Sequence, residues 1–135
     1  MRRSSLAWRR RMAKRLGQQD REAVLDFHKL LAKNHPQTFS DPASPVARLA
    51  PLKVGIHRDL CEKYPDVSKK TIRNFVNGYV YHPAYLRLTA VAQTNRIDLE
   101  GQVSGVVTEE QAQHSLALME KHAAERKARQ QSKSA

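Results

Sequence analysis

The stretch from Asp66 to Tyr79 constrains the fold most strongly, because it contains a helix start and two distinct helix faces. Ser68 is a favoured N-cap, since its hydroxyl can accept a hydrogen bond from a backbone N–H group of the first turn. After it, apolar residues recur at the spacing of one side of an α-helix, namely Ile72, Phe75, Val76 and Tyr79. The sequence therefore predicts a helix from 68 to about 80 with this side in the core.

The other side of this predicted helix is polar and cationic. Lys69, Arg73 and Asn77 lie four residues apart and would form one column, with Lys70 beside it. A helix N-terminus and cationic side chains both attract anions, and phosphate suits both. A run of charge is also typical of an ordinary solvated helix surface, so the pattern by itself leaves both interpretations open.

Three further helices are predicted from capping residues and apolar stripes. Asp20 would cap a helix from 21 to about 34, and a short helix would run from 54 to 64. Thr108 and Gln111 have the spacing of a capping box, which opens a helix that we expect to fade into the charged C-terminal tail. The chain is therefore predicted to be mostly helical.

The period of the pattern changes after Pro83. In residues 84–91 apolar and polar side chains alternate, which predicts a strand, and residues 96–99 alternate again after a turn. We therefore predict an antiparallel hairpin from these two segments, and a helix over 84–92 remains the alternative. The predicted fold class is mostly α with a small inserted β-hairpin (α+β).

In this hairpin Tyr85 and Arg87 would lie on the polar face, with Arg96 at the start of the partner strand. An exposed tyrosine beside arginines can stack on an unpaired base. A tyrosine packed in the core or against the hairpin explains the same spacing equally well.

The net charge of +11 is concentrated at the two ends of the chain. Residues 1–21 contain eight Lys and Arg against one acid, residues 120–135 contain five against two, and the remainder is close to neutral. This distribution predicts a basic flexible arm at 1–19, a folded domain at 20–120 and a basic tail at 121–135. For a polyanionic partner, such arms would raise the encounter rate and the general affinity, and selectivity would reside in the folded domain.

Cys61 is the only cysteine, which excludes an internal disulfide and fits a reducing, cytoplasmic setting. His57 lies one helical turn before it, but no second pair of ligands accompanies them, so we predict no metal site. The chain has no nucleophile elbow and no phosphate-binding glycine loop, and we predict neither an enzyme nor a cofactor. No apolar run is long enough to span a bilayer, and the basic N-terminus lacks the apolar segment of a secretory signal, so no membrane partner is expected.

Two motifs resemble the FinO/ProQ family of RNA chaperones: PLKVGI at 51–56, followed by Asp59 and Leu60, and RIDLEG at 96–101. Matching residues also lie between the motifs, and they are Ser68, Lys69, Ile72, Arg73, Tyr79, Tyr85 and Leu86. The resemblance covers about residues 22–120. It implies a mostly helical fold with an inserted β-hairpin. It also implies binding of structured RNAs, typically small regulatory RNAs and mRNA 3′ ends that finish in an intrinsic terminator, a stem followed by a uridine tail.

The resemblance further implies where RNA would be held. Backbone amides at the start of the Ser68 helix would bind the 3′-terminal nucleotide, and nearby cationic side chains would contact phosphates, while the stem would be recognised by its shape. Asn77 departs from the family, because a basic residue is common there in some members. We expect a monomer. The predicted RNA-binding residues are Lys53, Ser68, Lys69, Lys70, Arg73, Tyr85, Arg87 and Arg96.

Two other interpretations compete with this one. Residues 66–79 resemble the second helix of a DNA-binding helix-turn-helix, whose first residues would enter the major groove of double-stranded DNA. That interpretation leaves the hairpin and residues 51–56 unexplained. A basic protein without defined recognition would need only the charged ends. We therefore place RNA binding first and DNA binding second.

Overall fold

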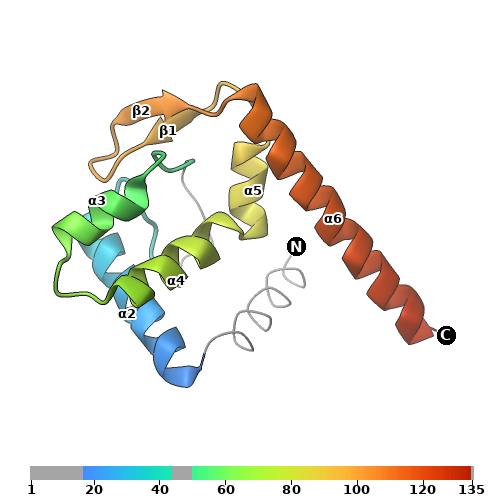
Figure 1. The fold of residues 1–135 in the computed structure, drawn as a ribbon, viewed down its shortest axis with the longest axis horizontal. Helices are drawn as coiled ribbons and strands as arrows, with labels where there is room; N and C mark the ends of the chain where they lie inside the picture. The colour runs from blue at the N-terminus through green and yellow to red at the C-terminus, as the bar shows by residue number, and fades with distance from the viewer. Residues whose placement is uncertain (1–16, 44–49, 135) are drawn as a thin grey trace.

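The computed structural model describes residues 17–43 and 50–134, so most of the predicted N-terminal arm, residues 1–16, lies outside the described residues. Figure 1 shows the described part as helices with one small β-hairpin, which confirms the predicted fold class. In chain order the elements are α2 (Gln18–Asn34), α3 (Ile56–Lys63), α4 (Lys69–Val80), α5 (Pro83–Thr89), β1 (Asn95–Ile97), β2 (Val103–Val106) and α6 (Glu109–Ser134).

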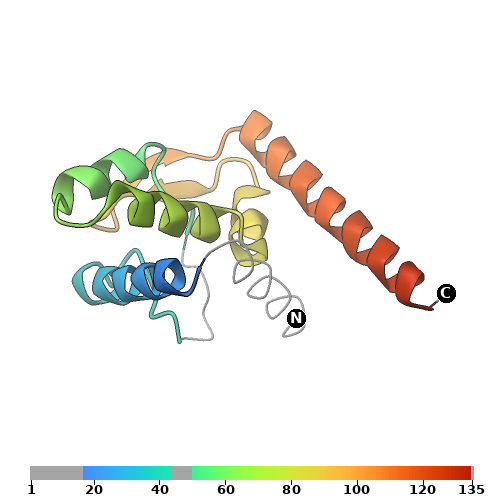
Figure 2. The same cartoon turned by 60° about the horizontal axis from the view of Figure 1, so that its bottom comes forward.

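The core lies where α2, α3 and α4 pack together, and Figure 2 shows α3 and α4 on the same side of α2. The rings of Phe27 in α2 and Phe75 in α4 meet edge to face with centroids 5.5 Å apart, which is a preferred aromatic geometry. The apolar side predicted for the helix from 68 to about 80 points into this core. Other buried side chains of this core are Leu31, Phe39, Leu52, Ile56, Leu60, Ile72 and Tyr79.

Two capping predictions are confirmed and one is wrong. The Ser68 hydroxyl accepts a hydrogen bond from the Thr71 N–H group at 3.0 Å, at the start of α4. Before α6, the Thr108 N–H group donates to Gln111 Oε1 at 3.0 Å, and the Gln111 N–H group donates to Thr108 Oγ1 at 3.1 Å. The helix α2 begins earlier than predicted, after Gly17 and without a side-chain cap, so Asp20 lies in its first turn. There its negative charge still favours the positive end of the helix.

Residues 83–89 form a helix, so the predicted strand over 84–91 is wrong and the helical alternative is right. Pro83 occupies the first turn, where its fixed φ suits a helix and its missing N–H costs nothing. The His82 ring nitrogen Nδ1 accepts a hydrogen bond from the Ala84 N–H group at 3.1 Å and caps the helix. The buried residues of α5 are Tyr85, Leu86 and Thr89, a helical spacing that the alternation of leucines concealed.

The β-hairpin pairs β1 with β2 in an antiparallel arrangement, with Ile97 opposite Val103. The second segment of the predicted hairpin, residues 96–99, thus lies partly in a strand, β1. Its partner is β2, which follows it in the chain, and not the segment 84–91. On its other side β1 pairs in parallel with the segment before α3: the Lys53 N–H group donates to Ile97 O at 2.8 Å, and the Ile97 N–H group donates to Pro51 O at 2.9 Å. This pairing fixes the chain immediately before α3 to the hairpin.

The helix α6 continues through the predicted tail to Ser134, so the expectation that it fades near residue 120 is wrong. Residues 121–134 are rich in Ala, Lys, Arg, Glu and Gln, which have high helix propensity. Its first turns pack against α5, and Figures 1 and 2 show the rest extending away from the body. Of the helices described, none is long and apolar enough to cross a membrane.

Candidate nucleic-acid interface

The N-terminus of α4 presents backbone donors that the described part of the chain leaves unused. The Ser68 hydroxyl accepts from the Thr71 N–H group, and the Ser68 carbonyl accepts from the Ile72 N–H group at 3.1 Å. Within residues 17–43 and 50–134, the N–H groups of Lys69 and Lys70 donate to no protein acceptor. Two outward donors at a positive helix end form an arrangement that suits an anion.

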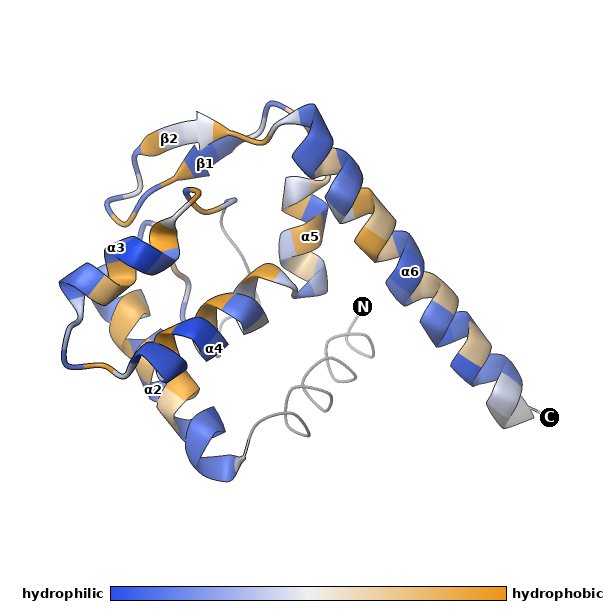
Figure 3. Cartoon of the chain, viewed as in Figure 1, coloured by the Kyte–Doolittle hydropathy of each residue, from blue (hydrophilic) through white to orange (hydrophobic). Residues whose placement is uncertain are grey.

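The cationic column predicted on α4 is exposed along its length, and Figure 3 shows hydrophilic and hydrophobic bands alternating on this helix. Lys70 forms an exposed ion pair with Asp20 of α2, with Nζ and Oδ2 3.2 Å apart, and such pairs contribute little and rearrange readily. In the described part of the chain, no carboxylate pairs with Lys69 or Arg73. These two cations therefore remain available to a ligand.

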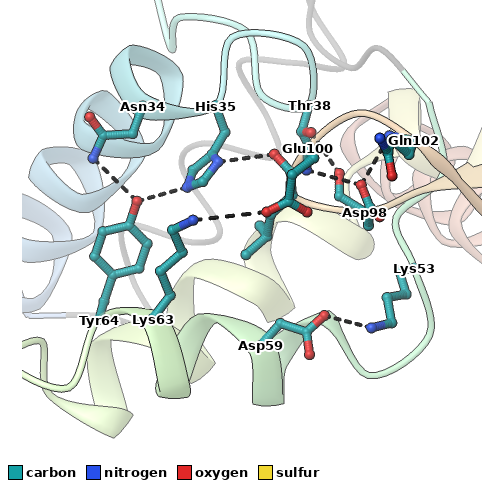
Figure 4. A network of polar contacts seen from close by, with 11 residues as sticks. Asn34, His35, Thr38, Lys53, Asp59, Lys63, Tyr64, Asp98, Glu100 and Gln102 are labelled. Atoms are coloured by element: carbon teal, nitrogen blue, oxygen red, sulfur yellow. Dashed lines mark hydrogen bonds and ion pairs between the residues drawn. The ribbon is translucent and has the colours of Figure 1, made fainter.

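Lys53 lies at a second basic place, before α3. Its Nζ atom donates to Asp59 Oδ2 at 2.9 Å, and this hydrogen bond together with the carboxylate charge raises the pKa of Lys53 (Figure 4). An open hollow of about 510 Å³ adjoins it, lined by Lys53, Val54, Gly55, His57, Arg58 and Asp59. Lys53 and Arg58 against the carboxylate of Asp59 leave this hollow positive on balance.

Tyr85 and Arg96 lie behind Lys53 and are buried, with 5% and 8% of their surfaces exposed. The Tyr85 hydroxyl accepts from the Leu52 N–H group at 2.9 Å, and Arg96 Nη1 donates to the Leu52 carbonyl at 2.8 Å. Arg96 Nη2 also donates to Gln111 Oε1 at 2.9 Å. The interpretation of Tyr85 as an exposed tyrosine is therefore wrong and the alternative, a tyrosine packed in the core, is right. Tyr85 and Arg96 both hold the segment that carries Lys53.

The eight predicted residues form separate groups rather than one cluster. Lys53 precedes α3, whereas Ser68 and its three cationic neighbours follow it, and Figure 1 shows the loop after α3 that leads to the start of α4. The eight residues of α3 span about 12 Å at 1.5 Å per residue. Arg87 is exposed on α5. A ligand that contacts both groups therefore has to reach from the segment before α3 to the start of α4.

Two surface features were not predicted from the sequence. His57 and Arg58 line the hollow beside Lys53, although only Lys53 was singled out. Tyr81, at the end of α4, is 45% exposed and is four residues from Asn77, so the spacing that defined the cationic column also applies to it. Extending that spacing by one more turn would have found Tyr81. In the described residues, no group of His, Cys, Asp or Glu could hold a metal ion.

The model of the ProQ/FINO family matches residues 21–133 of this chain. A protein named RNA chaperone ProQ from Haemophilus ducreyi is 41% identical over 86 residues, which cover 59% of this chain and 47% of the relative. A protein of the same name from Shewanella piezotolerans is 33% identical over 111 residues, which cover 80% of this chain and 51% of the relative. The chain thus spans about half the length of these curated relatives. Their name places them among RNA chaperones, which are binding proteins and not enzymes.

Two solved structures have a similar fold. A ProQ homolog from Legionella pneumophila has a TM-score of 0.57 and 32% sequence identity, with 73% of this chain and 79% of that chain covered. A FinO-like RNA chaperone from Neisseria meningitidis has a TM-score of 0.58 over 76% of this chain and 77% of its own, and at 20% identity it supports the fold alone.

Proposed function

This chain belongs to the ProQ/FINO family, and from that premise we propose that it is an RNA-binding chaperone that recognises the 3′ ends of structured RNAs. The proposed ligands are intrinsic-terminator hairpins with a uridine tail, in small regulatory RNAs and at mRNA 3′ ends. The protein would act on them as a monomer in the cytoplasm, in post-transcriptional regulation.

The observation that carries this proposal is the start of α4. The unused N–H groups of Lys69 and Lys70 lie beside the exposed side chains of Lys69 and Arg73, so backbone dipoles and full charges act on the same small volume. A helix N-terminus flanked by exposed cations can hold the terminal phosphate of a chain end together with the hydroxyl beside it. This supports recognition of an RNA end.

The hollow before α3 supports a second contact, with the phosphates of the stem. Lys53 and Arg58 offer positive charge there, since both side chain types are protonated at neutral pH. Double-stranded RNA is recognised mainly by its shape and by the positions of its phosphates and 2′-hydroxyls. One cationic place before α3 and another at the start of α4 therefore suit a stem and the tail that leaves it.

We expect binding to require a free 3′ end beside a stem. Gel-shift titrations at one stated salt concentration would compare a terminator hairpin ending in a uridine tail with the same RNA lacking the tail and with the same RNA carrying a 3′ phosphate. The unmodified tailed hairpin should bind most tightly, because the tailless RNA has no single strand to reach the start of α4 and the 3′ phosphate takes the place of the terminal hydroxyl that would be bound there. Equal affinities for the three RNAs would contradict the proposal.

Double-stranded DNA supplies the competing arm of the same experiment. A helix-turn-helix would use α4 in the major groove and would bind duplex DNA at least as tightly as the hairpin. The family match includes α5, the β-hairpin and α6, which that interpretation leaves without a role. We therefore expect duplex DNA to compete only weakly, and strong competition by DNA of any sequence would favour the alternative.

A further inference from the structure

Proteins that bind single strands commonly stack bases on aromatic side chains, and the tyrosine predicted for this task is buried. The four tyrosines of the chain differ sharply in accessibility. Tyr79 and Tyr85 are 2% and 5% exposed, and the hydroxyl of half-buried Tyr64 is hydrogen-bonded to His35. Tyr81 is 45% exposed. Of the described tyrosines, it alone has enough free surface to receive a base.

Tyr81 continues the cationic column of α4. Lys69, Arg73, Asn77 and Tyr81 follow one another at intervals of four residues, and all four are exposed. Tyr81 is the C-cap, but its φ of −91° and ψ of 0° remain in the helical region, and its N–H group donates to Asn77 O at 3.2 Å. Its side chain therefore belongs to the same face as the three before it. The column is about 18 Å long, because a helix rises 1.5 Å per residue.

The order of residue types along this column suits a short single strand of RNA. Two cations stand near the N-terminus of α4, where phosphates would be held, and an amide and a phenol ring stand at the other end. Asparagine offers both donors and an acceptor to a base edge, and an aromatic ring offers a stacking surface to any base. In the described part of the chain, Tyr81 has no part in the ring contacts that join Phe75, Tyr79 and Tyr85.

We propose that Tyr81 stacks on an unpaired base of the RNA tail whose 3′ end lies at the start of α4, with Asn77 beside that base. The inference rests on the proposed function and adds to it a base contact at the opposite end of the same helix face. It assigns to Tyr81 the stacking role that the sequence pattern suggested for Tyr85.

The test combines protein variants with tails that lack single bases. Wild type, Tyr81→Ala and Tyr81→Phe would be titrated with the tailed hairpin and with versions in which one tail nucleotide at a time is abasic, so that the base is removed and the phosphates are kept. Tyr81→Ala should weaken binding of the intact tail roughly tenfold, and Tyr81→Phe should bind nearly as well as wild type, because stacking needs the ring and not the hydroxyl.

The deciding result is whether the effects on affinity of Tyr81→Ala and of removing one tail base depend on each other. At one tail position, removal of the base should weaken binding to wild type but should have little further effect on Tyr81→Ala, as expected when two groups interact directly. Val103→Ala, which truncates a 63% exposed side chain on β2, is the matched control and should leave all affinities unchanged.

Failure of the stacking role can be distinguished from failure of the proposed function. If wild type prefers the tailed hairpin but every abasic position affects wild type and Tyr81→Ala equally, Tyr81 does not stack and the proposed function survives. If wild type binds tailed and tailless hairpins equally, tail recognition fails and the stacking role falls with it. Circular dichroism of each variant would check that the helix content of the protein is unchanged. No loss is expected, because Tyr81 lies at the end of α4 and outside the core.

Discussion

His35 joins three parts of the fold through the two nitrogens of one ring, as Figure 4 shows. Its Nδ1 atom lies 2.9 Å from the Leu99 carbonyl, and its Nε2 atom lies 2.8 Å from the Tyr64 hydroxyl. A carbonyl can only accept, so Nδ1 carries the proton and Nε2 accepts from Tyr64. The Tyr64 oxygen in turn accepts from Asn34 Nδ2 at 3.2 Å. A neutral His35 therefore satisfies the whole network.

Acid should destabilise the fold through this residue. Burial is the main cause that lowers the pKa of His35 below its ordinary 6.5, the nearby charge of Lys63 lowers it further, and the hydrogen bond to Leu99 and the charge of Glu100 oppose the shift. The unfolded chain thus binds the proton more readily, so the contribution to stability is complete above pH 6.5 and is lost as pH falls through the lowered pKa. Urea unfolding at a series of pH values would measure this loss.

His35→Gln tests the assignment, and His57→Ala, which changes an exposed histidine outside this network, is its control. The first variant should be less stable at neutral pH but should lose less stability on acidification than wild type. The control should retain the wild-type profile. An unchanged profile in His35→Gln would mean that another group is responsible.

The turn between β1 and β2 needs a glycine at position 101, close to His35. Gly101 has a φ of +76°, and a Cβ atom there would lie 2.6 Å from the Gln37 Cβ atom. Thr38 Oγ1 donates to the Asp98 carbonyl at 2.7 Å in the same place. The turn between β1 and β2 is therefore packed directly onto the segment that follows α2, which holds the hairpin against the helical core.

At the scale of an element, α4 combines a structural and a binding role in one helix. Its inner face supplies Ile72, Phe75 and Tyr79 to the core, and its outer face carries the column from Lys69 to Tyr81. Ser68 belongs to both roles, because its hydroxyl caps the helix at the point where we place the RNA 3′ end. Variants of Ser68 can separate the two.

Ser68→Asp and Ser68→Asn should both preserve α4, since Asp, Asn and Ser are comparable N-caps. Melting temperatures of the two variants should therefore be close to that of wild type. Only aspartate adds a negative charge at the proposed 3′-end site, so Ser68→Asp should weaken binding of the tailed hairpin by roughly tenfold or more. Ser68→Asn is the matched neutral control. Equal affinity of the two variants would place the RNA end elsewhere.

At the scale of the whole molecule, charge and folded structure are distributed differently. Most of the net charge of +11 lies near the chain ends, whereas the site residues lie on a body whose own charge is nearly balanced. The outer part of α6 carries exposed Lys121, Arg126, Lys127 and Arg129 away from that body. General attraction to RNA and selective contacts are therefore expected to reside in different segments.

Deletion of residues 1–16, which contain seven Lys and Arg and no acid, should weaken binding to all RNAs. The slope of log affinity against log salt concentration should become shallower by roughly 0.7 to 0.9 for each RNA phosphate that the shortened protein no longer neutralises. The ratio of affinities for tailed and tailless hairpins should stay unchanged. A deletion that altered this ratio but not the general affinity would contradict the separation of roles.

Local chemistry explains which parts of the fold were predictable. The starts of α4 and α6 follow from hydrogen bonds between residues three apart, Ser68 with Thr71 and Thr108 with Gln111. The segment from 84 to 91 was not predictable in this way, because its leucines fit either period. Its helix is secured by distant contacts, including the one of 2.7 Å between the hydroxyls of Thr89 and Ser115 in α6.

The sequence by itself determined the amphipathic α4, its cap, its cationic face and the membership of the family, because each depends on residue types at short spacings. Only the tertiary structure decided the roles of Tyr85, Arg96 and Tyr81. Tyr85 and Arg96 are buried because the backbone groups of Leu52, 33 and 44 residues away in the chain, are their hydrogen-bond partners. Tyr81 remains exposed because no described element covers the end of α4. Burial depends on such long-range packing, so it cannot be inferred from the spacing of residues along the chain.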